Sequence, residues 1–164
     1  MTETVSIVIG SESDLDLANK CADALDSLFI SNSIQVLSAH RTPGLLETHV
    51  RECESGGTKV FVAMAGLAAH LAGAVASKTV LPVIGVPGDG GPLSGMDALL
   101  STVQMPKGIP VATVAIGSAG ATNAAYLAAQ ILGVESEEVR SSLLKVREEG
   151  VEAIKESNKK LSDS

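Results

Sequence analysis

The stretch that decides the fold is VSIVIGSESD, residues 5–14, in which a nearly continuous apolar run passes directly into glycine, serine and acidic residues. Four further apolar runs follow, and each precedes turn residues and a segment with helical spacing. The four runs are Ile34–Leu37, Val60–Met64, Val83–Val86 and Val111–Ile116. Runs without polar alternation are typical of strands that are buried on both faces of a parallel sheet. The sequence therefore predicts an α/β fold with a five-stranded parallel sheet covered by helices.

Helix ends are marked by capping residues, proline and glycine. Ser13, with Asp16 three residues later, predicts a helix start at which Ser13 is the cap. Thr42-Pro43 predicts a second start, because proline is favoured at the first helical position. Gly56-Gly57 predicts the end of that second helix. The alanine-rich segment Ala119–Leu132 predicts another helix.

A change of composition divides the chain near Gly133. Residues 1–133 are mainly apolar and predict a single compact domain, whereas residues 134–164 are highly charged and predict a helical extension of that domain. The apolar positions of the extension form a discontinuous stripe, at Val139, Leu143, Val146, Ile154 and Leu161. This pattern is compatible with two arrangements: the extension packs on its own domain, or it packs on a neighbouring subunit.

Composition argues against nucleic acid as a partner. The 164 residues carry a formal charge of −7 and a sequence pI near 4.9, which is opposite to the charge that phosphate backbones attract. The aromatic residues are two phenylalanines and one tyrosine, too few for a platform on which bases stack. We therefore expect no nucleic-acid partner.

Neither a membrane segment nor a secretory signal is expected. The longest apolar stretch, residues 60–77, is interrupted by His70 and is shorter than the roughly 20 residues of a spanning helix. Residues 1–6 contain Glu3 and lack the basic and apolar regions of a signal peptide. Cys21 and Cys53 have no metal-binding spacing and read as reduced, buried residues. These features predict a cytoplasmic protein.

Polar residues follow the first two predicted strands, at the edge where open parallel sheets bind ligands. Ser11 and Asp14 follow the first strand at a helix start, where backbone N–H groups favour phosphate; a simple cap is the alternative. Ser38, His40 and Arg41 follow the second strand. An imidazole transfers protons near neutral pH, and an arginine guanidinium binds phosphate or carboxylate with two N–H groups. This cluster predicts a catalytic and anion-binding role.

The third strand is followed by small residues around one imidazole, from Gly66 through His70 and Leu71 to Gly73. Such a loop allows a ligand to approach the backbone and excludes water, although a lone histidine among apolar residues also fits a core position. His49 lies within a predicted helix, and we expect it on a solvated face. The glycine-rich segment 88–92 fits a lid over a ligand or a surface connection.

Several catalytic classes lack their motifs. The sequence contains no G-x-x-x-x-G-K-[ST], G-x-G-x-x-G, H-E-x-x-H or G-x-S-x-G segment, so phosphate-loop kinases, dehydrogenases, zinc proteases and serine hydrolases lose their main support. The three histidines are not spaced as metal ligands on one element, and we expect no metal.

Taken in order, four motifs resemble those of the N5-carboxyaminoimidazole ribonucleotide mutase family of purine biosynthesis. They are GSESD at 10–14, SAHRTP at 38–43, AAHL at 68–71, and LSGMD at 93–97 with VQMP at 103–106. The resemblance extends from about Val5 to Leu132. It implies a flavodoxin-like three-layer domain, a homo-octamer with active sites at subunit contacts, and no metal or organic cofactor. The closing helix is not part of this resemblance; we expect the extension to pack on a neighbouring subunit.

The resemblance implies a role for each motif residue. It implies that the ribose 5-phosphate of a small ribonucleotide is held by four residues, Ser11, Asp14, Ser38 and Arg41. It implies that His40 is the general acid and base. It implies that His70, with the loop from Gly66 to Leu71, lines a pocket for the carboxylate or carbon dioxide. The family moves a carboxylate from the exocyclic nitrogen to ring carbon C4.

Two alternatives remain beside this interpretation. A related branch, the aminoimidazole ribonucleotide carboxylases, uses free carbon dioxide and typically has lysine after the histidine and an arginine-serine-asparagine pattern in the third loop. This sequence has Arg41 and Leu67-Ala68-Ala69, so the mutase branch is favoured. A non-catalytic flavodoxin-like binding module is the second alternative. Its receiver form needs aspartate and lysine where Ala65-Gly66 and Ile116-Gly117 stand.

Overall fold

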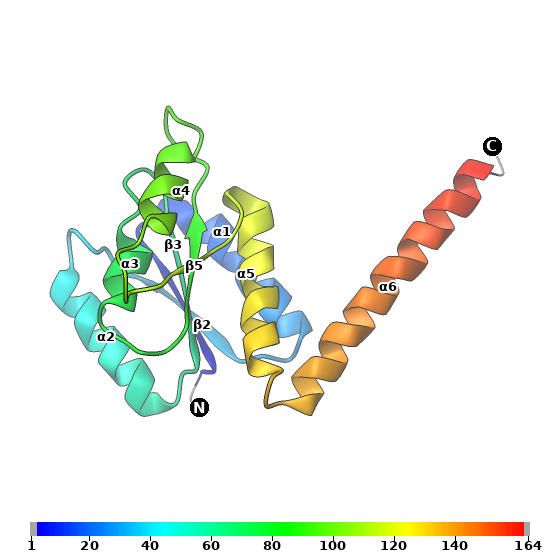
Figure 1. The fold of residues 1–164 in the computed structure, drawn as a ribbon, viewed down its shortest axis with the longest axis horizontal. Coiled ribbons are helices and arrows are strands. Elements are labelled where there is room, and N and C mark those ends of the chain that lie inside the picture. Colours follow the sequence, from blue (N-terminus) through cyan, green and yellow to red (C-terminus); the bar gives the residue numbers. More distant parts are fainter. Residues whose placement is uncertain (1–2, 163–164) are drawn as a thin grey trace.

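The core of the molecule is a five-stranded sheet, seen in a computed structural model that describes residues 3–162 (Figure 1). All neighbouring strands are parallel, in the order β2-β1-β3-β4-β5. The strands are β1 (Val5–Ile9), β2 (Asn32–Val36), β3 (Val60–Ala65), β4 (Val83–Pro87) and β5 (Ala112–Thr113). This strand order is the flavodoxin-like one, whose ligands bind where the order reverses, between β1 and β3. The α/β prediction is confirmed.

The three inner strands match the apolar runs most closely. All residues of β1 and β4 are buried, as are the first five residues of β3. The edge strands differ from prediction: β2 begins at Asn32 rather than Ile34, and β5 contains only two residues. An edge strand is paired on one side only and is partly exposed, so a continuous apolar run does not define its ends.

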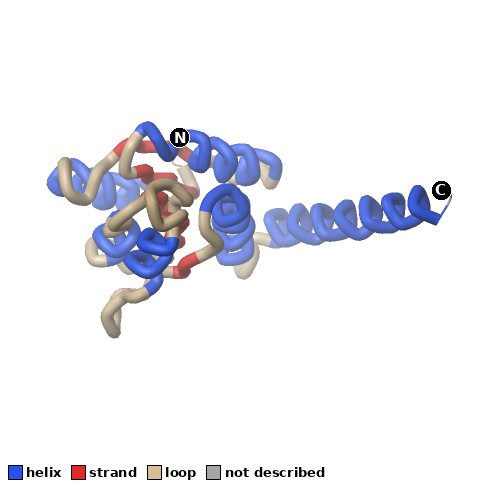
Figure 2. The backbone as a smooth tube through the Cα atoms, turned by 90° about the horizontal axis from the view of Figure 1, so that it is seen from above, coloured by secondary structure: helices blue, strands red, loops and turns tan. Residues whose placement is uncertain are grey.

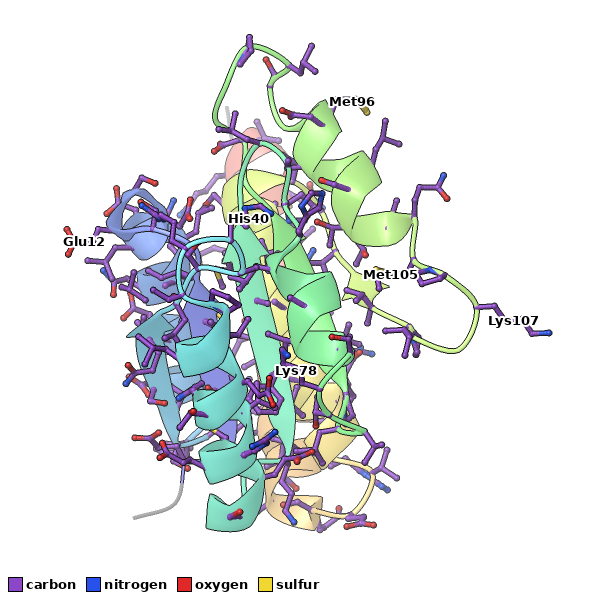
Figure 3. All side chains as sticks on the ribbon, turned by 90° about the vertical axis from the view of Figure 1, so that its left-hand side faces the viewer. Glu12, His40, Lys78, Met96, Met105 and Lys107 are labelled. Atoms are coloured by element: carbon purple, nitrogen blue, oxygen red, sulfur yellow. The ribbon has the colours of Figure 1, made fainter. Side chains whose placement is uncertain are left out.

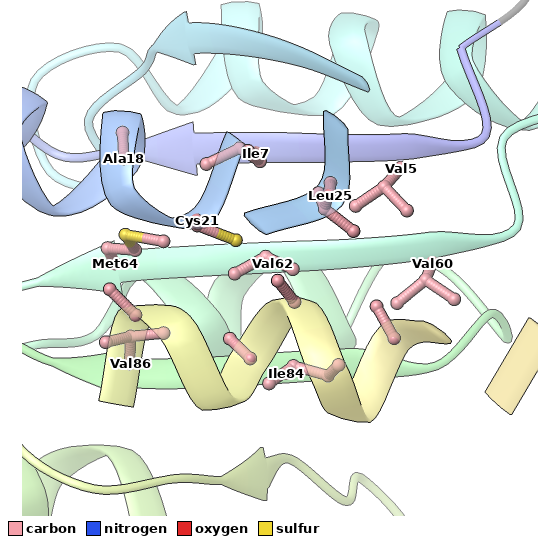
Figure 4. Packing of buried hydrophobic residues seen from close by; sticks show 14 of the residues in the cluster. Val5, Ile7, Ala18, Cys21, Leu25, Val60, Val62, Met64, Ile84 and Val86 are labelled. Atoms are coloured by element: carbon pink, nitrogen blue, oxygen red, sulfur yellow. The ribbon is translucent and has the colours of Figure 1, made fainter. Parts of the chain in front are cut away.

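Helices cover both faces of the sheet (Figures 1 and 2). They are η1 (Glu12–Asp14), α1 (Leu15–Ser27), α2 (Pro43–Gly56), α3 (Leu71–Ala76), α4 (Met96–Val103), α5 (Gly117–Leu132) and α6 (Glu137–Ser162). Helices α1 and α5 pack on one face, where Cys21 and Leu25 contact the cluster formed by Ile7 and Val62 (Figure 4). On the other face Leu46 of α2 and Val75 of α3 pack with Phe61.

Two of the predicted helix caps differ in the structure. The hydroxyl of Ser11, not that of Ser13, accepts from a backbone N–H, at 3.4 Å from Ser13 N, because a short 3-10 helix precedes α1. Thr42 makes no side-chain cap; its Oγ1 accepts from Ser38 N at 2.9 Å instead. Pro43 does begin α2, and Gly57 follows its end at φ 98° in the left-handed region that favours glycine.

Helix α6 projects away from the domain (Figures 1 and 2). Its first turns pack on the core through Val139, Leu143 and Val146, and Ser136 Oγ accepts from Val139 N at 3.3 Å. Farther along, Ile154 and Leu161 are 64% and 76% exposed. Packing of this extension on a neighbouring subunit stays a prediction, and the last two residues of the extension lie outside the described residues.

Within residues 3–162, no helix combines sufficient length with sufficient apolarity to cross a bilayer. Cys21 and Cys53 are free thiols, and burial raises the pKa of the Cys21 thiol to about 12. Cys21 is fully buried, whereas Cys53 is partly exposed.

Candidate active site

A cavity of about 910 Å³ opens at the carboxyl ends of the strands, where the loops after β1, β2, β3 and β4 meet. It lies at the position that the strand order assigns to ligands. All of the predicted site residues line this cavity: Ser11, Asp14, Ser38, His40, Arg41, Gly66, His70 and Leu71. The topology thus brings together residues from three separate loops. In Figure 3, His40 lies between Glu12 and Met96.

Two imidazoles, from the loops after β2 and β3, form a direct pair. His40 Nε2 lies 2.8 Å from His70 Nδ1, and either nitrogen is able to be the donor, depending on the tautomers. The rings meet edge to face, with centroids 4.9 Å apart and planes at 87°. Both side chains are exposed to the cavity, so His70 is not a core histidine. A ligand in the cavity can therefore reach both rings and the hydrogen bond that joins them.

Arg41 connects the first two loops. Its Nη2 donates to the carbonyl oxygen of Gly10 at 2.8 Å, and its backbone N–H donates to Ser38 Oγ at 3.1 Å. Among the ion pairs of the described residues, none involves Arg41. The guanidinium therefore lines the cavity with N–H groups to spare for an anion.

Asp14 and Ser11 lie at the start of the first helical segment. Burial of the Asp14 carboxyl raises its pKa above the ordinary value, while a hydrogen bond from the Ser11 backbone acts in the opposite direction. The backbone N–H of Asp14 donates to the carbonyl oxygen of Ser11 at 3.0 Å. The carboxyl group is half-buried in the cavity wall, where it is able to accept a hydrogen bond from a ligand hydroxyl.

The loops after β3 and β4 pack backbone against backbone. Gly88 N donates to Ala65 O at 2.8 Å, and a Cβ added at Gly88 would lie 3.1 Å from the Cα of Gly66. Residues 88–91 of the glycine-rich segment line the cavity, whereas residues 93–106 do not. The glycine-rich segment 88–92 is therefore part of the cavity wall, and the residues after it connect this wall to α4.

Sequence reasoning missed a polar group on another side of the cavity. Lys20 Nζ of α1 donates to Ser118 Oγ of α5 at 2.7 Å, and both residues line the cavity with Asp89. Gly117 has φ +70°, and a Cβ there would lie 2.8 Å from the Asp89 carboxylate. The close approach of Asp89 explains the glycine. No motif signals Lys20 and Ser118, since they meet only through the packing of two helices.

His49 does not lie on a solvated helix face, so that prediction is wrong. Its Nε2 is 2.9 Å from Ser6 Oγ and 3.4 Å from Cys53 Sγ, and Ser6 is fully buried. Burial lowers the pKa of His49, while the carboxylates of Glu52 and Glu3 act in the opposite direction. The residue packs against β1 away from the cavity, which the helical pattern of α2 did not indicate.

Within residues 3–162, no three His, Cys, Asp or Glu side chains are arranged to hold a metal ion. The cavity offers hydroxyls, two imidazoles, the Arg41 guanidinium, the Lys20 ammonium and the carboxylates of Asp14, Asp16 and Asp89. Its cationic and hydroxyl groups suit an anionic organic ligand.

Comparison with known proteins identifies the family. A family model described as AIR carboxylase matches residues 4–153. The chain belongs to the AIR carboxylase family. Together with relatives that are named mutases, this match confirms the resemblance indicated by the four motifs. The match covers the whole sheet and most of α6, as far as residue 153.

Several relatives of this chain share the name N5-carboxyaminoimidazole ribonucleotide mutase. The N5-carboxyaminoimidazole ribonucleotide mutase of Pseudomonas aeruginosa is 49% identical over 154 residues, which cover 94% of each chain. The protein of that name from Bacillus subtilis is 47% identical over 161 residues, 98% of this chain and 99% of its own. The one from Escherichia coli is 49% identical over 139 residues, 85% and 82% of the two chains.

Solved structures of the AIR carboxylase family agree in fold. The crystal structure of Treponema denticola PurE has a TM-score of 0.88 at 31% identity, and covers 96% of this chain and 97% of its own. A variant of Treponema denticola PurE2 has a TM-score of 0.90 at 30% identity, with coverage of 98% and 99%. The flavodoxin-like architecture is thus shared over nearly the full chain.

Proposed function

We propose that this protein is an N5-carboxyaminoimidazole ribonucleotide mutase, which forms 4-carboxy-5-aminoimidazole ribonucleotide in purine biosynthesis. Relatives of that name at 47–49% identity support the proposal. The observation that carries it is the His40–His70 pair, 2.8 Å apart in the cavity beside an arginine that has no carboxylate partner among the described ion pairs. This arrangement supplies proton transfer and anion binding in one place.

The ribose 5-phosphate end is held by the first two loops. The Arg41 guanidinium and the hydroxyls of Ser11 and Ser38 bind the phosphate, for which charge-assisted hydrogen bonds are the strongest available. Asp14 accepts from a ribose hydroxyl. Anchoring this end fixes the imidazole ring of the substrate beside the histidines, which favours recapture of carbon dioxide over its escape.

The reaction balances with one proton carrier. The bond between the exocyclic nitrogen and the carboxylate breaks, carbon dioxide forms, and His40 gives a proton to that nitrogen. Carbon C4 then attacks carbon dioxide, and the proton displaced from C4 returns to His40. His70, bonded to His40 at 2.8 Å, fixes the orientation of its ring. The histidine pair ends each cycle with the protons it began with.

The loop from Gly66 to Leu71 forms the pocket for carbon dioxide. Its residues are small or apolar apart from His70, and all but the buried Ala69 line the cavity next to the histidine pair. A surface of this kind offers few partners to water, so the reactive intermediate is protected from hydration.

A homo-octamer in the cytoplasm is proposed as the working form. Large apolar side chains lie exposed on α4 and on α6, at Met96, Leu100, Val151, Ile154 and Leu161. Their burial against further copies of the chain would close the cavity and cover the projecting helix. The mass in solution, from light scattering, checks the assembly; a monomer at micromolar concentration would contradict it.

The test of the activity compares two substrates. The purified protein is given N5-carboxyaminoimidazole ribonucleotide, or aminoimidazole ribonucleotide with bicarbonate, and formation of the C4-carboxylated product is followed. We expect efficient turnover of the first substrate and slow turnover of the second. The reverse preference would show a carboxylase that uses free carbon dioxide. Binding without either reaction would show a non-catalytic module.

A further inference from the structure

The loop that presents His70 is held by a side chain from another element. Ser101 of α4 lies beside this loop, and its Oγ accepts from the backbone N–H of Ala69 at 2.9 Å. Ala69 is only 2% exposed, so water has little access to replace this acceptor. Ser101 is not among the residues that line the cavity. The bond thus reaches the residue next to His70 from outside the site.

The Ser101 hydroxyl is itself fixed within α4. It donates to the carbonyl oxygen of Asp97 at 2.6 Å, one turn earlier in the helix. With its proton directed to Asp97, the oxygen presents a lone pair toward Ala69. The helix, the hydroxyl and the loop therefore form one connected series of hydrogen bonds.

The loop needs such support because its backbone is unusual. Leu67 has φ 55°, in the left-handed region that a bulky residue seldom adopts. Within the loop, His70 N donates to Ala68 O at 2.8 Å, so a shift at Ala69 moves the start of α3 as well. His70 is bonded to His40 from that position. A small displacement of the loop would lengthen the imidazole–imidazole bond.

We propose that Ser101 is a positioning residue, which holds the His70 loop in place so that His70 Nδ1 stays within hydrogen-bond distance of His40 Nε2. Ser101 does not line the cavity, and it acts on the loop through the Ala69 N–H. Its effect falls on proton transfer, because the phosphate-binding residues belong to the first two loops. Displacement of a catalytic group by about 1 Å lowers a rate by up to about 100-fold.

The kinetic test rests on the proposed mutase function. Ser101→Ala removes the acceptor, and we expect kcat to fall about tenfold while KM changes less than about twofold. Ser101→Thr keeps the hydroxyl and should restore kcat. Thr102→Val is the matched control, since the Thr102 hydroxyl bonds Ala98 O at 2.7 Å on the same helix and touches no loop. It should leave both constants unchanged.

A spectroscopic test is independent of turnover. The chain has three histidines, so the imidazole ¹⁵N signals of the ligand-free protein are few. Ser101→Ala should shift the signals of His40 and His70 and leave those of His49 in place; Thr102→Val should shift none. If these shifts occur in a protein that does not turn over the ribonucleotide, the proposed function fails and the positioning role stands.

Wild-type signals for His40 and His70 in Ser101→Ala would overturn the positioning role of Ser101. Equal signal changes at all three histidines would also overturn it. If Ser101→Ala does not fold, Ser101→Cys takes its place, because a thiol is a weaker acceptor at the same position. Its kcat should then be reduced at normal KM; a wild-type kcat would overturn the role.

Discussion

Two histidine sites in this molecule use similar contacts for different purposes. His40 and His70 bond each other at 2.8 Å in an open cavity at the carboxyl ends of the strands. His49 bonds Ser6 at 2.9 Å and contacts Cys53 on the far side of the domain core, half-buried and with a lowered pKa. The first site lines the ligand cavity next to Arg41, which has no carboxylate partner among the described ion pairs; His49 does not line this cavity.

The difference shows that location decides the chemistry of an imidazole here. A hydrogen-bonded histidine next to a hydroxyl and a thiol has the ingredients of a nucleophilic site, yet the Ser6 hydroxyl is fully buried. The His40–His70 pair has no adjacent nucleophile of that kind among the described residues, but it lies where the strand order places ligands. Replacing these histidines and their neighbours should therefore affect turnover at the cavity and only stability at His49.

Replacement of His40 should have the largest effect on turnover. In His40→Asn the proton carrier is lost, and we expect kcat to fall about 1,000-fold, while substrate affinity measured by calorimetry changes little. The matched control is His49→Asn, which should keep kcat within about twofold of the wild type. Equal losses of kcat in the two variants would contradict a catalytic role that is specific to His40.

Replacement of Arg41 should separate binding from proton transfer. Arg41→Ala removes a charge-assisted contact with the phosphate, and KM should rise about 10- to 100-fold, with a smaller change in kcat. Arg51→Ala is the control, since this exposed arginine of α2 pairs with Glu47 and does not line the cavity. A normal KM for Arg41→Ala, measured by steady-state kinetics, would remove Arg41 from the phosphate site.

The smallest effect concerns His49 and the stability of the fold. In His49→Gln the Ser6 hydroxyl loses its imidazole partner, and the free energy of unfolding should fall by about 1 kcal/mol near pH 8. Urea denaturation measures this difference, and turnover should be unchanged.

The pH dependence of that difference follows from the lowered pKa of His49. The unfolded chain takes up the proton near its ordinary pKa of about 6.5, and the folded protein only at lower pH. The wild type therefore loses stability as pH falls below about 6.5, and the variant lacks this contribution. The difference between them should shrink from pH 8 to pH 5. A difference that grows toward low pH would show that the His49 pKa is raised.

The inner strands were predictable because their apolar residues are buried on both faces, which a continuous apolar run indicates directly. Val5–Ile9 is buried on both faces, and the predicted run and the observed strand have the same bounds. The strand ends also indicated where polar residues would gather. All of the predicted site residues line the cavity.

Features that depend on distant contacts were not predictable. His49 reads as a solvated helix residue until β1 places Ser6, 43 positions away, against it. Lys20 and Ser118 meet only because α1 packs on α5. Ser101 gives no sign in the sequence that it binds a backbone N–H of the loop after β3. In each case the partner is chosen by tertiary packing rather than by local pattern.

The central claim is that the carboxylate moves within one closed pocket, and an isotope experiment tests it most directly. N5-carboxyaminoimidazole ribonucleotide labelled with ¹³C in its carboxylate is supplied in unlabelled bicarbonate, and the label is followed into the C4-carboxylated product. The account predicts product that keeps the label, because carbon dioxide is recaptured before it escapes. Product diluted to the isotopic composition of the bicarbonate pool would contradict it.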